Sequence, residues 1–227
     1  MADDTLSISE ELLLLAMDDE KGKLVSPSMD GLAYTQAGAV LFELILMGKI
    51  EIEDDKIVTW PVQPMGDPIF DMAIARFAKK NAVKKLGYWI GRLSKDSRKI
   101  KQILIEKLIS LGALRKEERQ FLWTFKYNRY PTDDSRIEDR IRMRVFEGLF
   151  GEGTIDSRDY VLLTLIGTAK LEKVVFPEDQ AKEAKKLIAD LKRDDAIGSA
   201  ISSAIVRLEA AMTAAIVASV AASAAGS

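Results

Sequence analysis

Three cations lie in the first turn of a predicted helix, or just beyond it, in the stretch SKDSRKIKQILIEKL. Asp96 or Ser97 can start this helix by accepting a hydrogen bond from a free backbone N–H group. The helix dipole favours acidic residues there, but Arg98, Lys99 and Lys101 follow instead. Arg98 and Lys101 are three positions apart, so both side chains can reach one ligand. The free N–H groups and this pair of cations together predict a site for phosphate or a similar anion.

The composition excludes most of the common catalytic and metal-binding chemistry. The 227-residue chain contains no Cys and no His, which rules out thiol catalysis, histidine-containing triads and cysteine or histidine metal sites. Carboxylate or lysine chemistry remains, and the carboxylate candidates are Asp18, Asp19, Glu20, Asp133 and Asp134. These residues flank predicted turns, where carboxylates commonly cap helices and order loops. We therefore expect a protein that is not an enzyme and that holds no metal or other cofactor.

The hydrophobic pattern predicts a mainly α fold, with one domain over residues 1–227. This domain is expected to be a multi-helix bundle with one or two short β-hairpins. The predicted helices span residues 7–17, 32–47, 68–80, 82–93, 97–111, 135–149, 156–168, 177–193 and 197–223. The hairpins are predicted at about 49–59 and 114–127, because apolar and polar residues alternate there on both sides of a charged turn.

The two ends of the chain carry weaker signals. We expect residues 1–6 and 224–227 to be disordered. The start of the chain has no basic segment followed by an apolar one, so nothing there suggests secretion. The Ala-rich segment 210–225 is too weakly hydrophobic to predict a membrane span. These features indicate a cytoplasmic protein.

Positive charge is concentrated between Arg76 and Arg119. Fourteen Lys or Arg residues and four Asp or Glu residues give this segment a net charge of +10, whereas the whole chain carries −2. The residues expected on its basic surface are Lys79, Lys80, Lys84, Lys85 and Arg92. Such a segment is typical of a solvated face, of a surface facing an anionic membrane, or of a nucleic-acid-binding surface.

Two segments of similar pattern support the nucleic-acid alternative. ELILMGKIEIEDDKIV, starting at Glu43, and KLISLGALRKEERQFL, starting at Lys107, each join a helix through Gly to a charged hairpin. The second hairpin is predicted to turn at Lys116–Arg119. Winged-helix proteins also use a helix followed by a hairpin, although this connection is common elsewhere. Against nucleic-acid binding, the helix at 98–111 is apolar over most of its circumference and leaves few side chains for base edges.

Four further segments are informative when they are taken together. In chain order they are EELLLLAMDDEKGKL, GAVLFELILMGKIEIED, IKQILIEKLISLGALRKEERQFLWTF and YVLLTLIGTAKLEKVVF, and an Ala-rich helix follows them. This series resembles the Golgi phosphoprotein 3 family, peripheral membrane proteins that recognise phosphatidylinositol 4-phosphate. The resemblance implies a mostly α-helical domain with a protruding hairpin that mediates oligomerisation. Here that hairpin would be 114–127, with Phe121, Trp123 and Phe125.

The family's lipid site matches this chain only in part. Its basic pair corresponds to Arg98 and Lys101. A Trp and an Arg that the family uses nearby correspond to Ser28 and Ala37, and Gln36 or Lys23 could substitute for them. The departure suggests a divergent, quite possibly prokaryotic member that binds phosphatidylinositol 4-phosphate or another anionic phospholipid.

The leading hypothesis is a non-enzymatic adaptor that binds phosphoinositide or another anionic lipid at a membrane surface. The resemblance implies a Golgi location in a eukaryote, and the cytoplasm or the inner membrane face in a prokaryote. It also implies a homo-oligomer formed through the 114–127 hairpin. Eukaryotic relatives bind cytosolic tails of Golgi glycosyltransferases, but the sequence does not identify a protein cargo. The alternative is a winged-helix-like nucleic-acid binder that uses the basic segment 76–119.

Overall fold

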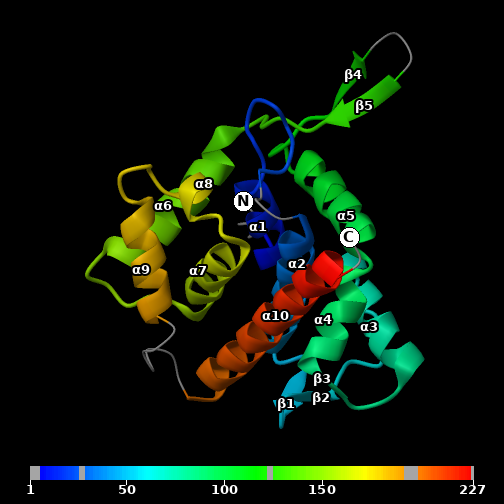
Figure 1. Cartoon of the computed structure of the whole chain (residues 1–227). Coiled ribbons are helices and arrows are strands. Elements are labelled where there is room, and N and C mark those ends of the chain that lie inside the picture. Colours follow the sequence, from blue (N-terminus) through cyan, green and yellow to red (C-terminus); the bar gives the residue numbers. More distant parts are fainter. Residues whose placement is uncertain (1–5, 26–28, 122–124, 192–198, 226–227) are drawn as a thin grey trace.

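A computed structural model describes residues 6–25, 29–121, 125–191 and 199–225 (Figure 1). Its helices are α1 (Ile8–Leu15), α2 (Met29–Leu46), α3 (Pro68–Lys80), α4 (Leu86–Ser94), α5 (Ser97–Ser110), α6 (Ser135–Phe150), α7 (Ser157–Ala169), α8 (Glu172–Val175), α9 (Ala181–Leu191) and α10 (Ser199–Ala225). Its strands are β1 (Glu51–Glu53), β2 (Lys56–Thr59), β3 (Lys84–Lys85), β4 (Glu117–Phe121) and β5 (Phe125–Arg129). The predicted mainly α fold with short hairpins is confirmed.

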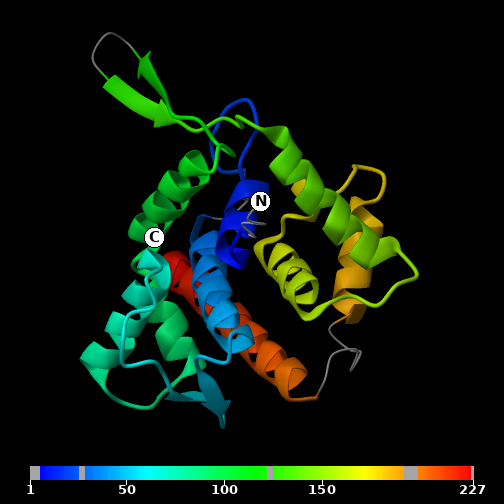
Figure 2. The ribbon, with the colours of Figure 1, turned by 180° about the vertical axis from the view of Figure 1, so that it is seen from behind.

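Helix α2 lies at the centre and contacts α1, α4, α7 and α10. Helices α6 to α9 gather on one side of it and α3 to α5 on the other, as the front and back views show (Figures 1 and 2). Helix α1 is buried along its whole length, which fits its run of four leucines. Helix α10 packs closely on α2 at Gly38, where an added Cβ would lie 1.9 Å from Met212 Sδ.

Local sequence signals explain several helix starts. A capping box begins α1, since Glu10 N–H donates to Ser7 Oγ and Ser7 N–H donates to the Glu10 carboxylate. Helix α3 starts after Asp67 with Pro68 in its first turn, an arrangement that suits the free N–H groups there.

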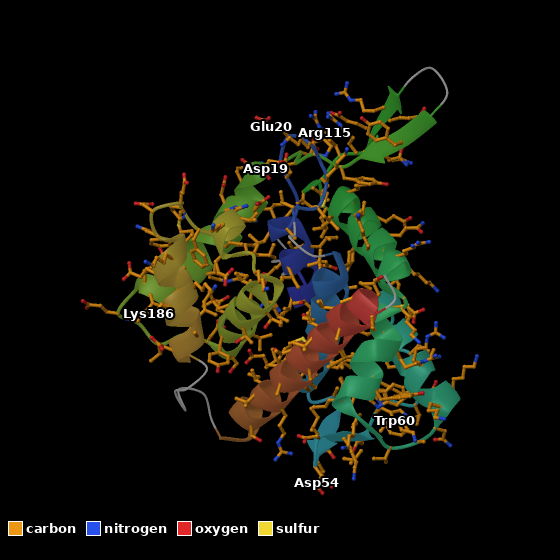
Figure 3. All side chains as sticks on the ribbon, in the orientation of Figure 1. Asp19, Glu20, Asp54, Trp60, Arg115 and Lys186 are labelled. Atoms are coloured by element: carbon orange, nitrogen blue, oxygen red, sulfur yellow. The ribbon has the colours of Figure 1, made fainter. Side chains whose placement is uncertain are left out.

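The first predicted hairpin is one edge of a three-stranded antiparallel sheet of order β1-β2-β3. Asp54 and Asp55, which form its turn, both have positive φ, as a two-residue hairpin turn with the strand twist requires. Asp54 lies at the end of the molecule opposite β4 and β5 (Figure 3). Lys84 and Lys85 were predicted to lie in a helix but form β3, because Ile57 and Lys56 of β2 are their register partners. The helix therefore starts later, at Leu86.

The second hairpin protrudes from the body (Figures 1 and 2). The predicted turn at Lys116–Arg119 is wrong, since Glu117 pairs with Arg129 and the ladder continues to Phe121 opposite Phe125. Residues 122–124, including Trp123, separate the two strands in the sequence and lie outside the described ranges.

The chain segment before α2 supports the base of this hairpin. Tyr130 N–H donates to the Gly22 carbonyl, and Thr132 N–H donates to the Asp19 carbonyl. Gly22 has φ of +58°, and a Cβ there would meet the backbone of Tyr130 and Pro131 at 2.4 Å. Only glycine fits this turn without displacing the hairpin base.

The structure describes Leu6 and residues 224–225, which belong to the two end segments expected to be disordered. Leu6 is buried and its carbonyl accepts a hydrogen bond from Arg158, while α10 continues to Ala225. Residues 1–5 and 226–227 lie outside the described ranges. Within α10, Ser203–Ala225 is long and apolar enough to cross a membrane, and 17% of its most apolar window is buried. This criterion concerns only length and composition, which core helices can also satisfy.

Candidate anion-binding site

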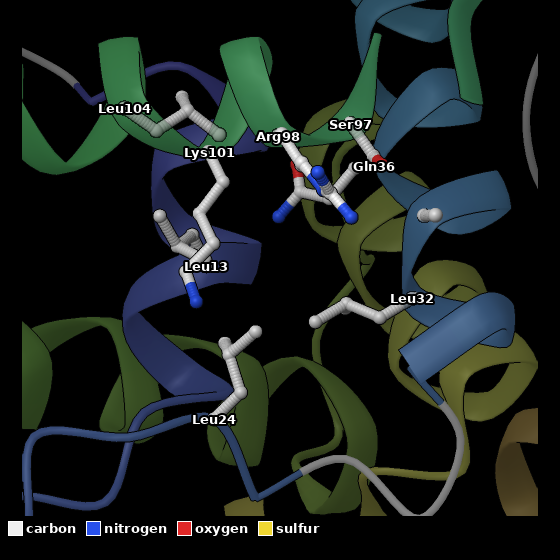
Figure 4. A pocket seen from close by; sticks show the side chains of 9 residues that line it. Leu13, Leu24, Leu32, Gln36, Ser97, Arg98, Lys101 and Leu104 are labelled. Carbon is white, nitrogen blue, oxygen red and sulfur yellow. The ribbon is translucent and has the colours of Figure 1, made fainter. Parts of the chain in front are cut away.

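The first turn of α5 opens onto a cavity of about 170 Å³ that it shares with α1, α2 and the segment between them. We call this the α2–α5 cavity (Figure 4). Its lining residues are Leu13, Leu24, Leu32, Ala33, Gln36, Ser97, Arg98, Lys101 and Leu104. The two cations that the sequence placed on one side of a helix therefore do face one cavity.

The N-terminus of α5 lacks the cap that the sequence suggested. Asp96 makes no side-chain hydrogen bond to the helix, because its carboxylate binds the Arg76 guanidinium at 2.8 and 2.6 Å. Among the described residues, no acceptor is seen for the backbone N–H groups of Ser97 and Arg98. The positive end of this helix is thus left available to an anion.

Lys101 lies in an environment that disfavours its positive charge. Its side chain is half-buried, and burial lowers its pKa below the ordinary value. Neither Lys101 nor Arg98 forms an ion pair with a carboxylate in the part of the chain that the structure describes. Burying an unpaired ammonium costs free energy, which an anion in the cavity would offset.

Gln36 is the third polar group in the cavity. It is only 5% exposed, and neither Oε1 nor Nε2 has a hydrogen-bond partner within the described ranges. Figure 4 shows its amide beside the Arg98 guanidinium, while Lys101 extends past Leu13 towards Leu24. A buried amide normally has partners, so these two unsatisfied polar atoms need an explanation.

Lys23, the other substitute considered, does not line the cavity. Lys23 Nζ lies over the Tyr127 ring, 5.3 Å from its centroid. Ala37 is fully buried in the core. Ser28 lies outside the described residues. Of the two substitutes that the sequence suggested, the structure therefore brings Gln36 to the basic pair and not Lys23.

A second groove begins at the same two cations. It has a volume of about 450 Å³ and lies between α5 and the base of the β4–β5 hairpin. Its lining residues are Arg98, Lys101, Gln102, Ile105, Glu106, Ile109, Lys116, Asn128 and Tyr130. We call this the α5–hairpin groove. Lys116 gives it a further cation, so a ligand at Arg98 and Lys101 can extend towards the hairpin.

The predicted basic surface is spread along α4 and does not encircle the cavity. Its exposed members lie at the end of α3, in β3 and in the last turn of α4: Lys79, Lys80, Lys85 and Arg92, with Lys84 half-buried. Helix α4 has nine residues and is therefore roughly 13 Å long. Only Arg92 lies at the end of α4 that leads into α5.

The remaining candidates have structural roles. Asp18 accepts the N–H groups of Glu20 and Lys21, and Asp134 caps α6. No group of three or more acidic side chains that could hold a metal ion occurs in the described ranges. Helix α5 packs on α1, α2 and α3. This packing buries Ile100 and Leu104, while Lys99, Gln102 and Glu106 lie on the exposed face of α5.

The apolar wall of the cavity was missed by reasoning from sequence. Leu13, Leu24 and Leu32 come from three separate segments, and each reads simply as a core residue. No local signal marks them. The spacing of the Arg98–Lys101 pair was the one signal that pointed to this location.

The comparisons with known proteins agree with the resemblance stated above. The profile of the family described as Golgi phosphoprotein 3 (GPP34) matches residues 8–211. Vacuolar protein sorting-associated protein 74 of Schizosaccharomyces pombe is 27% identical over 161 residues, which are 62% of this chain and 47% of that protein. The protein of the same name from Eremothecium gossypii is 25% identical over 166 residues, 64% of this chain and 49% of that protein. The chain thus spans about half the length of these curated relatives. It belongs to the Golgi phosphoprotein 3 family.

Proposed function

We propose that this protein is a non-enzymatic peripheral membrane adaptor that binds anionic phospholipid, phosphatidylinositol 4-phosphate or a similar lipid, at Arg98 and Lys101. The observation that carries this proposal is the half-buried, unpaired ammonium of Lys101. A phosphate group would supply the missing negative charge. The open N–H groups of Ser97 and Arg98 would add hydrogen bonds of the kind that helix N-termini give to phosphate.

The basic segment supports binding at a membrane surface. Lys79, Lys80, Lys85 and Arg92 are exposed. Each cation near an anionic leaflet contributes about 1 kcal/mol, so several of them would give reversible, salt-sensitive attachment. On this view the pocket selects the head group, and the surface lysines add affinity without selectivity.

The family and its relatives support the cellular setting. The family is described as a Golgi phosphoprotein, and the relatives are named for vacuolar protein sorting. We infer a cytoplasmic protein at a Golgi membrane in a eukaryote, or at the inner membrane face in a prokaryote. The protruding β4–β5 hairpin, with Phe121, Trp123 and Phe125, is proposed to mediate homo-oligomerisation, because a two-stranded hairpin rarely stands alone without a partner surface.

Vesicle sedimentation tests the proposal directly. Vesicles of phosphatidylcholine alone, with phosphatidylserine, and with phosphatidylinositol 4-phosphate would be compared at low and high salt. We expect the anionic vesicles to sediment the protein at low salt. We expect Arg98→Ala combined with Lys101→Ala to weaken binding at least about tenfold, since two charge-assisted contacts are lost.

The matched control is Lys95→Ala combined with Lys99→Ala. Both lysines are exposed, lie within three residues of the basic pair, and line neither the α2–α5 cavity nor the α5–hairpin groove. This control removes the same charge but should weaken binding only about as much as two surface cations do. Equal losses in the two double variants would reduce the site to general surface charge. Absence of binding to every anionic vesicle would refute the proposal, and tight, salt-resistant DNA binding would favour the nucleic-acid alternative.

A further inference from the structure

Helix α10 is buried in its first half and exposed in its second. Leu208 and Met212 are fully buried and belong to the core. Residues 213–225, which we call the α10 end, include no buried residue, and Val217 and Val220 are 63% and 56% exposed. None of these thirteen residues is charged. The α10 end is therefore an exposed apolar surface, and a surface of this kind commonly marks an interaction site.

The serines of the α10 end satisfy their hydroxyl groups within the helix. Ser219 Oγ donates to the Ile216 carbonyl at 2.8 Å, and Ser223 Oγ donates to the Ser219 carbonyl at 3.0 Å. Serines bonded in this way need no water to accept their protons. These two hydroxyl groups therefore add little cost when the helix enters apolar surroundings, where every polar group must be satisfied internally.

Helix α10 brings this apolar end to the corner between α4 and α5. Arg207 and Ala211, earlier along α10, line a groove with Lys85 and Tyr88 at the start of α4. The two helices pack against each other. The front and back views both show the last turns of α10 next to the end of α4 and the start of α5 (Figures 1 and 2). The α10 end thus lies on the side of the molecule where the first turn of α5 begins.

That corner is strongly basic. Residues 92–101, which we call the α4–α5 corner, contain five Lys or Arg residues and one Asp, which gives them a net charge of +4. The one acid, Asp96, is paired with Arg76. The exposed cations of the corner are Arg92, Lys95, Arg98 and Lys99.

This charge distinguishes between two possible occupants of the apolar surface. A second copy packed on the α10 end would bring two corners of the same sign towards each other, and like charges disfavour such an interface. An anionic bilayer would instead pair the corner with negative charge while it covers the apolar helix face. Charge complementarity therefore favours a bilayer.

The length of the α10 end favours a helix that lies in the membrane interface and does not cross the bilayer. Thirteen helical residues extend about 20 Å, whereas the hydrocarbon core is about 30 Å thick. The preceding turns are held in the core by Leu208 and Met212. Only the α10 end is thus available for insertion while the fold stays intact.

We propose that the α10 end is an apolar membrane contact, with Val217 and Val220 in the head-group region of an anionic bilayer and the α4–α5 corner facing its surface charge. The inference rests on the function proposed above and adds a second contact to it, at a distance from the α2–α5 cavity lining. Reversible anchoring of this kind is typical of proteins that combine a shallow apolar insertion with a basic patch.

A site-specific fluorescent label tests the contact directly. The chain contains no cysteine, so Val217→Cys or Val220→Cys places a nitrobenzoxadiazole label at one known position. Vesicles of phosphatidylcholine with phosphatidylinositol 4-phosphate should shift its emission to the blue, and lipids spin-labelled near the head group should quench it. Met143→Cys, at a 60% exposed position on α6, is the control, and its label should stay in water.

A pair of serine substitutions measures how much the contact contributes. Val217→Ser combined with Val220→Ser keeps a similar helix propensity and should weaken vesicle binding about tenfold, because two apolar side chains no longer leave water. Neither valine lines the α2–α5 cavity, so the affinity for soluble inositol 1,4-bisphosphate should not change. Val62→Ser combined with Val206→Ser, at exposed positions outside the α10 end, is the matched control and should change neither affinity.

The outcomes separate this inference from the proposed lipid site. Labels at 217 and 220 that stay in water on bound vesicles would overturn the α10 contact and leave the Arg98–Lys101 site intact. Insertion with unchanged affinity in the Arg98→Ala and Lys101→Ala double variant would overturn that site and support the α10 contact. A blue shift that appears without vesicles and grows with protein concentration would overturn the inference in favour of a second copy. Failure to bind any anionic vesicle would overturn both.

Discussion

Two lysines of α5, Lys101 and Lys107, have opposite surroundings although they lie less than two turns apart. Lys107 Nζ contacts Glu10 at 2.6 Å and Asp67 at 2.8 Å. Burial lowers its pKa, but the hydrogen bonds and charges of these two carboxylates outweigh that effect, and the net shift is upward. Lys101 is half-buried and has no carboxylate partner in the described ranges, so burial lowers its pKa.

The comparison distinguishes cations that stabilise the fold through ion pairs, such as Lys107, from cations that form no ion pair in the described ranges, such as Lys101. Arg144 resembles Lys107 in having two carboxylate partners. It pairs with Glu11 at 2.9 Å and with Asp159 at 2.6 Å. A buried carboxylate such as Glu11 is tolerated only while its cation remains in place. The fold would lose little if Lys101 were neutral, which agrees with the binding role proposed for it.

The largest effect is expected when the ion pairs of Lys107 are removed. Lys107→Met leaves Glu10, which is 1% exposed, without its cation. We expect a loss of about 3–5 kcal/mol in the free energy of unfolding, because an unpaired buried charge remains. Lys101→Met is the matched variant and should change stability by less than about 1 kcal/mol. Urea denaturation followed by circular dichroism measures both, and equal losses would erase the distinction between the two lysines.

The next largest effect concerns Glu138, a carboxylate whose burial disfavours its charged form although it pairs with Arg142. Burial raises the pKa of Glu138 to about 7, although Arg142 lies within 2.9 Å and opposes the shift. A raised carboxyl pKa means that the folded state favours the protonated form. This contribution to stability is full below the unfolded-state pKa near 4.5 and is lost as the pH rises through 7.

We therefore expect the free energy of unfolding to fall by about 1–3 kcal/mol between pH 5 and pH 8 through Glu138. Glu138→Gln removes the titrating group and should flatten that part of the pH profile. Urea denaturation across this pH range provides the measurement. A variant with an unchanged slope would show that other groups cause the dependence.

The smallest effect tests whether the cations in the first turn of α5 lower the stability of the protein while one of them serves binding. Arg98→Glu replaces a cation by an anion at the positive end of the helix and should stabilise the protein by about 0.3–1 kcal/mol. Lys99→Glu makes the same charge change in the same turn but outside the cavity. Both should raise the melting temperature slightly, whereas only Arg98→Glu should abolish vesicle binding. Destabilisation by both variants would mean that the cations already serve the fold.

The sequence predicted the longer helices and the basic pair because both depend on local spacing, but it missed the short helix α8. Periodicity located α3, α5 and α6 to within a residue or two, and Arg98 and Lys101 share a cavity as their separation requires. The pairing of Asp96 with Arg76 was not predictable, since it joins residues 20 positions apart and removes an expected cap. The apolar wall formed by Leu13 and its neighbours also depends on long-range packing. Such contacts have no local signature.

The pKa values of the two lysines in solution test the central claim most directly. Nuclear magnetic resonance of ¹³C-dimethylated lysines, assigned with Lys101→Arg and Lys107→Arg, would follow both before and after addition of inorganic phosphate or inositol 1,4-bisphosphate. We predict that Lys101 starts below the ordinary lysine pKa and rises when phosphate binds, while Lys107 starts above it and does not move. A Lys101 pKa at or above the ordinary value, unchanged by either phosphate, would contradict the assignment of this cavity as an anion site.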